Sequence, residues 1–257
     1  MGSWADTFVA SVGSGLAARA VPADVEPMTA YMRHQFPFLG VKAPGQQAAV
    51  RAALAAAGRP SNENEVGAAN DALWARPERE HRYAGCHLAG RFAPKASPEF
   101  VDHVARWVTT DPWWDTRDPL ARRCVGQVVR HHRALRPTMD RWLAGDNGWL
   151  TRSAIIHMGG WKHDIDRDWV FTACLSRGED PDFFIRNAIG WILRDLAWVD
   201  PDAVVAFVEG RGAPVRSSLS KREALKNVGG GSITERSRRA VRPSASSTSL
   251  PRRPLVG

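Results

Sequence analysis

The sequence predicts an all-α protein whose helices form antiparallel pairs. Strand signals are nearly absent, because no stretch sustains an alternation of apolar and polar residues and no hairpin turn joins β-branched runs. Instead, segments of about 11–18 residues with helical periodicity are separated by Pro, Gly, Asp and Asn. Roughly a dozen short helices with tight connections favour a stacked solenoid, with a compact helical bundle as the alternative.

Each helix is placed by its periodicity, and several are also placed by residues at their starts. Ser97 is a candidate cap before Pro98 and Glu99, and Asp200 before Pro201 repeats this pattern. The predicted helices are 3–20, 24–36, 44–57, 62–74, 78–92, 97–109, 117–132, 137–144, 149–160, 165–176, 182–198, 201–209 and 218–227. Two helices take about 35–45 residues, which suggests HEAT-like units without strong sequence self-similarity.

The positive charge is unevenly distributed along the 257 residues. The net charge is +8, and the stretch from Val228 to the C-terminus holds six Arg and one Glu, which leaves +3 for residues 1–227. Residues 229–257 are rich in Ser, Arg and Pro and have few large apolar residues, so we expect a disordered basic tail after a folded domain at 1–228. The tail either attracts nucleic acid or only solubilises the chain.

The cysteines and the N-terminus indicate a cytoplasmic protein. Cys86, Cys124 and Cys174 lie far apart with no CxxC spacing, so reduced thiols are the simple interpretation. No basic segment followed by an apolar stretch opens the chain, and no run approaches the roughly 20 apolar residues of a membrane span. We therefore expect a soluble protein without a membrane partner.

The stretch Thr110–Pro119 combines two indoles with several carboxylates. Trp114 and Asp118 are four residues apart and share a face if the backbone is helical there. Pro119 disfavours the helical conformation at Asp118, so Asp118 could instead cap the next helix. In both cases a carboxylate lies at a helix end close to Trp114. The alternative is that Trp113 and Trp114 belong to the core and the acids only cap helices.

Two later helices carry further polar candidates. Asp146 or Asn147 caps a helix that holds Arg152 in or near its first turn. The helix dipole disfavours a cation there, so Arg152 either works with an anion or pairs with a neighbouring acid. On the helix 182–198, Asn187, Trp191 and Arg194 form a second face that suits a sugar–phosphate surface. The alternative is an amphipathic helix with one semi-exposed Trp.

These segments, in this order and spacing, resemble the AlkD-like family of DNA alkylation-repair glycosylases. The resemblance covers about residues 20–227. The matching stretches are Glu26–Met32 running into Phe38–Gly40, Trp113–Asp118, Asp146–Arg152, Ala188–Arg194 and Leu219–Ala224.

The resemblance implies a right-handed superhelix of HEAT-like helical pairs with a concave, basic DNA-binding face. It also implies a monofunctional enzyme that hydrolyses the N-glycosidic bond of positively charged N3-methyladenine and N7-methylguanine in duplex DNA, without flipping the base into a pocket. Trp114, Asp118 and Arg152 match the catalytic cleft, and Tyr31 and Trp191 match aromatic DNA contacts. Further DNA contacts are expected from Asn187, Arg194, Lys221 and Arg222.

In the expected mechanism Asp118 stabilises charge on the sugar and orients water, while Arg152 holds a phosphate. Pro119, which directly follows Asp118, departs from the family pattern and could re-aim the carboxylate. The rival function is a non-catalytic helical-repeat module that binds DNA or a protein. An acid on a DNA-facing surface repels phosphate, so Asp118 favours the enzyme.

Metal and cofactor signals are weak. The eight His include the pair His131-His132 and the separated His157 and His163, but no HExxH or zinc spacing occurs. No Gly-rich loop follows a predicted strand, so no nucleotide cofactor is expected. We predict no metal, no cofactor and a monomer whose partner is double-stranded DNA containing alkylated bases.

Overall fold

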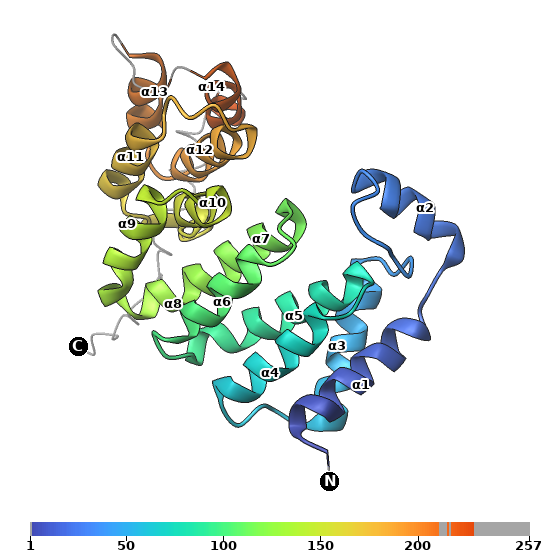
Figure 1. Ribbon diagram of the computed structural model, residues 1–257. Helices are drawn as coiled ribbons and strands as arrows, with labels where there is room; N and C mark the ends of the chain where they lie inside the picture. Colours follow the sequence, from blue (N-terminus) through green and yellow to red (C-terminus); the bar gives the residue numbers. More distant parts are fainter. Residues whose placement is uncertain (1, 211–214, 216, 229–257) are drawn as a thin grey trace, which may run out of the picture.

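The computed structural model describes residues 2–210, 215 and 217–228, and every regular element in them is helical (Figure 1). The helices are α1 (Trp4–Ala17), α2 (Pro22–Tyr31), α3 (Ala43–Ala57), α4 (Glu63–Trp74), α5 (Arg79–Phe92), α6 (Phe100–Thr109), α7 (Trp114–Leu120), α8 (Gly126–His131), α9 (Arg136–Ala144), α10 (Gly148–Ile156), α11 (Arg167–Ser176), α12 (Phe183–Leu196), α13 (Pro201–Glu209) and α14 (Ser218–Leu225). The all-α prediction is confirmed.

The helices pack as successive pairs that follow a curve from the N-terminus to α14 (Figure 1). The closest pairings join α1 to α3, α4 to α5, α10 to both α9 and α12, and α12 to α14. One apolar core runs through all of these pairs, from Phe8 in α1 to Ala224 in α14. This arrangement is the helical-repeat solenoid that the short helices and tight connections predict. The predicted tail, 229–257, lies outside the described residues.

Two of the predicted helix starts have different outcomes. Asp200 caps α13 as expected, because its side chain accepts a hydrogen bond from the N–H of Ala203. The prediction that Ser97 caps the next helix is wrong, because α6 begins at Phe100. The N–H and hydroxyl of Ser97 instead donate to the Glu63 carboxylate, at 3.1 and 2.8 Å. Ser97 therefore fastens the loop to α4.

Pro119 lies inside a helix. The alternative in which Asp118 caps a helix that starts at Pro119 is therefore wrong. A π-helical segment, Ala121–Val125, follows α7 directly and runs into α8, where the Gly126 N–H donates to the Ala121 carbonyl. Proline has no N–H to donate to the preceding turn, and π segments inside helices often occur at functional sites.

Helix α2 stands apart from the other helices (Figure 1) and buries none of its residues. Its connection to α3 is anchored by the buried Glu80 carboxylate, which accepts hydrogen bonds from the N–H groups of Leu39 and Val41 at 3.0 Å. Gly40 has a φ of +81°, and a Cβ there would lie 2.1 Å from the Val21 carbonyl oxygen. The loop, rather than packing of α2 itself, therefore positions Tyr31.

Among the described helices, none has both the length and the apolar character needed to span a membrane.

Candidate functional site

Six of the predicted site residues lie around one cleft of about 500 Å³. They come from α2, α7, α10 and α12, which are far apart in the sequence but converge on the inner side of the curve (Figure 1). The predicted residues in the cleft are Tyr31, Trp114, Asp118, Arg152, Asn187 and Trp191, and the cleft is completed by Arg33, Trp113, Phe183 and Phe184. The fold thus joins the candidate carboxylate, guanidinium and aromatic groups in one place.

Asp118 is held by Arg152. The Nε and Nη2 groups of Arg152 donate to the two carboxylate oxygens of Asp118, each at 2.8 Å. The Nη1 group of Arg152 donates to the Phe184 carbonyl at 2.5 Å, and longer contacts reach Asn187 Oδ1 at 3.4 and 3.5 Å. The Arg152 side chain is only 2% exposed, whereas that of Asp118 is 11% exposed.

This geometry favours one of the two interpretations of Arg152. All of its polar groups are directed to acceptors within the protein, and its surface is closed to solvent. The acid-paired interpretation therefore describes Arg152 better than a phosphate clamp does. A bidentate pair also fixes the orientation of a carboxylate, which a single contact does not. Pro119 has not turned Asp118 away from the cleft, since Asp118 lines it.

Aromatic side chains form the walls of the cleft. Tyr31 meets Trp114 edge to face, with ring centroids 5.8 Å apart, and Tyr31 is 73% exposed. Trp191 lies between two cations, with Arg152 at 5.1 Å and Arg194 at 5.7 Å from its ring centroid. Trp113, which also lines the cleft, packs edge to face on Phe184 at 5.7 Å. Exposed faces of this kind bind sugars and cationic rings.

The start of α7 is fixed by a buried polar network that the sequence patterns did not indicate. Arg79, which is fully buried, donates to both carboxylate oxygens of Asp115 at 2.8 and 2.6 Å, and the Tyr83 hydroxyl donates to Asp115 at 2.7 Å. The Arg79 guanidinium also lies 3.7 Å from the Phe36 ring centroid. Burial, and then the Asp115 carboxylate, raise the pKa of Tyr83 far above its ordinary value, so its hydroxyl stays a donor.

A basic strip extends from the cleft along α5 and the π segment. Arg123 lines three further pockets, among them one of about 780 Å³ that it shares with Asp118 and one of about 310 Å³ that it shares with His87 and Arg91. Within residues 2–210, 215 and 217–228, neither Arg91 nor Arg123 has an ion-pair partner, whereas Arg122 pairs with Asp195 at 2.7 Å. Burial lowers the pKa of His87, and the neighbouring Arg123 and Arg91 lower it further.

The other predicted DNA contacts lie outside the cleft lining. Arg194 donates to Glu223 at 3.0 Å, and Lys221 and Arg222 lie on α14, where the Arg222 side chain is 72% exposed. Gly190 allows α14 to pack against α12, because a Cβ at this position would lie 2.5 Å from the Glu223 Cβ. The close packing brings these cations alongside the helix that carries Trp191.

The described part of the chain holds no group of three or more His, Cys, Asp or Glu side chains that could bind a metal ion. The cleft is lined by the polar side chains of Asp118, Arg152, Asn187, Arg33 and Tyr31.

Comparison with known proteins places the chain in a family. The chain is similar to a solved structure described as a predicted DNA alkylation repair enzyme from Enterococcus faecalis, with 28% sequence identity and a TM-score of 0.74. That similarity covers 83% of this chain and 98% of the other. No curated protein matches the chain. The family model for DNA alkylation repair enzymes matches residues 12–228. With most of its length matched, the chain belongs to the DNA alkylation repair enzyme family.

Proposed function

We propose that this protein is a DNA glycosylase that hydrolyses the N-glycosidic bond of positively charged alkylated purines, such as N3-methyladenine and N7-methylguanine, in duplex DNA. Family membership supports an enzyme of DNA alkylation repair. The observation that carries the finer assignment is the Asp118 carboxylate, oriented by Arg152 and still partly exposed in an aromatic cleft.

The chemistry of the substrate explains why one carboxylate is sufficient. A cationic alkylated purine leaves without protonation, so the general acid of ordinary glycosidases is unnecessary. When the bond breaks, its electron pair stays on the purine nitrogen and neutralises the base. Positive charge develops on the deoxyribose, and water adds to that carbon and loses a proton.

Asp118 acts on the developing sugar cation. Arg152 occupies one lone pair on each carboxylate oxygen, and an ionised carboxylate offers about four acceptor sites, so roughly two remain for the cleft. These sites stabilise the cationic sugar and accept a hydrogen bond from the attacking water. Because the carboxylate is already oriented, little reorganisation is required during the reaction.

The aromatic residues hold the nucleotide around Asp118. Trp114 and Trp191 contact the sugar and the cationic base through their indole faces, and Tyr31 contacts the DNA at the mouth of the cleft. In this proposal the base is not flipped into an enclosed pocket. Asn187, Arg194, Lys221 and Arg222 contact the sugar–phosphate backbone. Arg91 and Arg123, which form no ion pair among the described residues, extend this contact along α5 and the π segment.

Single-turnover release of N7-methylguanine from a defined duplex tests the proposal. Wild type should release the base, and Asp118→Asn should lose most of the release while keeping its affinity for the duplex. Asp102→Asn, which changes an exposed acid on α6, is the matched control and should behave like wild type. Duplex binding without release by wild type would instead support a non-catalytic binding module.

A further inference from the structure

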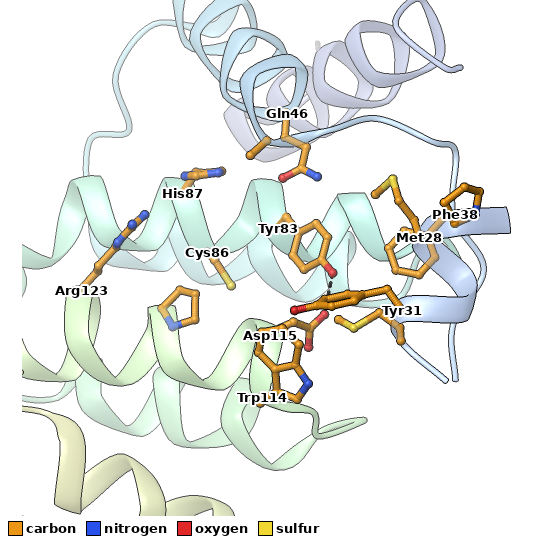
Figure 2. Close-up of a pocket in the computed structure, with 14 residues that line it drawn as sticks. Met28, Tyr31, Phe38, Gln46, Tyr83, Cys86, His87, Trp114, Asp115 and Arg123 are labelled. Carbon is orange, nitrogen blue, oxygen red and sulfur yellow. Dashed lines mark hydrogen bonds between the residues drawn. The ribbon is translucent and has the colours of Figure 1, made fainter. Parts of the chain in front are cut away.

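Another pocket, of about 520 Å³, lies on the other side of the wall formed by Tyr31 and Trp114. Figure 2 shows these two rings along one side of the pocket, with Gln46 and His87 across from them. Most of the remaining lining is apolar and includes Met28, Met32, Phe38 and Ala43. A volume of several hundred Å³ with apolar walls and few polar groups is typical of sites for small flat molecules.

The carboxylate and the amide that line this pocket already have partners. Asp115 accepts hydrogen bonds from Arg79 and Tyr83, the latter drawn in Figure 2, and the Gln46 side-chain amide donates to the Val41 carbonyl at 2.6 Å. Arg123 is the one charged lining residue without an ion pair in the described part of the chain. A cationic ligand therefore finds no free carboxylate here and meets a like charge, whereas a neutral ring avoids this repulsion and the larger cost of burying a charge.

The two compartments therefore prefer different charges. In the cleft, Asp118 accepts two hydrogen bonds, both from Arg152, whereas Asp115 accepts three, from Arg79 and Tyr83. The acceptor sites that Asp118 keeps favour a cationic purine. Bond cleavage converts the purine from a cation to a neutral molecule, because the electrons of the broken bond remain on its ring. The same event removes the electrostatic attraction to Asp118 and makes an apolar pocket the better environment.

We propose that the pocket beyond Tyr31 and Trp114 binds the neutral methylated purine after its release, so that it serves as a product site. This inference rests on the proposed glycosylase function. Tyr31 and Trp114 line both compartments, so a base stacked on this wall needs only to pass around one of the rings. Tyr31 suits this passage, because it is 73% exposed and lies on a helix that buries none of its residues.

The methionines allow a direct test of the site. Two of the five methionines, Met28 and Met32, line the pocket, whereas Met139 and Met158 are buried elsewhere in the core. NMR of isotopically labelled methionine methyl groups, with free 3-methyladenine as the probe, should show saturable shifts of the Met28 and Met32 signals only. The permanently cationic 3,9-dimethyladeninium should bind at this site at least about tenfold more weakly, a difference of about 1.4 kcal/mol.

Two alanine variants on α3 complete the test. Ala43→Phe fills the pocket from an exposed position and should reduce the affinity for 3-methyladenine by about tenfold or more. Ala52→Phe adds the same side chain to an exposed position that lines none of the pockets described above and should bind like wild type. Any one of three results would contradict the product site. The Met28 and Met32 signals could stay unmoved at high 3-methyladenine concentration, the cation could bind as tightly as 3-methyladenine, or Ala43→Phe could bind 3-methyladenine as well as wild type does.

The proposed function and the product site fail in different ways. Excision of N7-methylguanine from duplex DNA by wild type, together with silent Met28 and Met32 signals, would disprove the product site alone. Saturable binding of 3-methyladenine without excision would disprove the glycosylase assignment and leave the pocket as a site for neutral purines. Ala43 touches neither Asp118 nor Arg152, so Ala43→Phe should retain single-turnover excision.

Discussion

Arg152 and Asp118 form a bidentate ion pair that joins α10 to α7 at the cleft, with both hydrogen bonds at 2.8 Å. The arginine is closed to solvent and the carboxylate keeps a small exposed surface. The pair therefore orients one reactive group and leaves it accessible from a single side. In the proposed function its partners differ in role, because Asp118 meets the substrate and Arg152 positions Asp118.

Arg152→Ala should abolish most excision and destabilise the protein. Removing one partner of a buried pair leaves an uncompensated charge, which costs about 3–5 kcal/mol. The salt dependence of duplex binding should stay unchanged, because Arg152 directs its donors into the protein. Denaturant unfolding, single-turnover excision and binding at several salt concentrations measure the three effects. If the slope of log affinity against log salt concentration fell by about one, Arg152 would instead contact a phosphate.

Arg79 and Asp115 should control the position of Trp114. Arg79→Met removes a buried guanidinium from Asp115 and should cost about 3–5 kcal/mol of unfolding free energy, with a loss of excision. Tyr83→Phe removes one hydrogen bond from the same carboxylate and should cost about 1 kcal/mol. If the two variants were equally stable, the bidentate pair would not be the main constraint on the start of α7.

Most of the fold could be predicted because helices are determined by local sequence. For α12, the apolar periodicity and the capping residue lie within or next to the helix itself. This local pattern correctly separates a buried face from a face that carries Asn187 and Trp191. The predicted 97–109 helix shows the limit of local signals. Ser97 has the right sequence context for a cap, but Glu63, which is 34 residues away, takes both of its donors.

The partners within the site could not be predicted from spacing. Asp118 and Arg152 are 34 residues apart, and Arg79 and Asp115 are 36 residues apart, so their pairing depends on how the helices stack. The same is true of Arg91 and Arg123, which become notable only because neither forms an ion pair in the part of the chain that the structure describes. The aromatic and acidic candidates were identified because they fall in compact segments of the sequence.

Arg123→Ala should weaken duplex binding in a salt-dependent way. Each lost phosphate contact lowers the slope of log affinity against log salt by about one. Arg59→Ala is the matched control, because Arg59 is exposed after α3 and lines none of the pockets described above. Binding isotherms at several salt concentrations measure both slopes. An unchanged slope for Arg123→Ala would mean that Arg123 contacts no phosphate and that the basic strip is not part of the DNA interface.

His157 should make the stability of the fold sensitive to acid. It is fully buried between Trp161 and Trp169, with ring centroids 5.6 and 5.0 Å away, and its Nδ1 lies 2.6 Å from the Ala154 carbonyl oxygen. Burial lowers the pKa of His157 from 6.5 to about 4. The folded protein therefore keeps this imidazole neutral, while the unfolded chain takes up a proton below about pH 6.5.

The sign of this linkage sets the expected result. The contribution of His157 to stability is present above about pH 6.5 and is lost as the pH falls toward about 4, by about 2 kcal/mol between pH 7 and pH 5. His157→Phe removes the titration, so its unfolding free energy should fall less than that of wild type over this interval. Urea unfolding at both pH values measures the loss of unfolding free energy in each protein. The contribution of the carboxylates is the same in both proteins, so it cancels when the two losses are subtracted. Equal losses in the two proteins would mean that His157 is not kept neutral by burial.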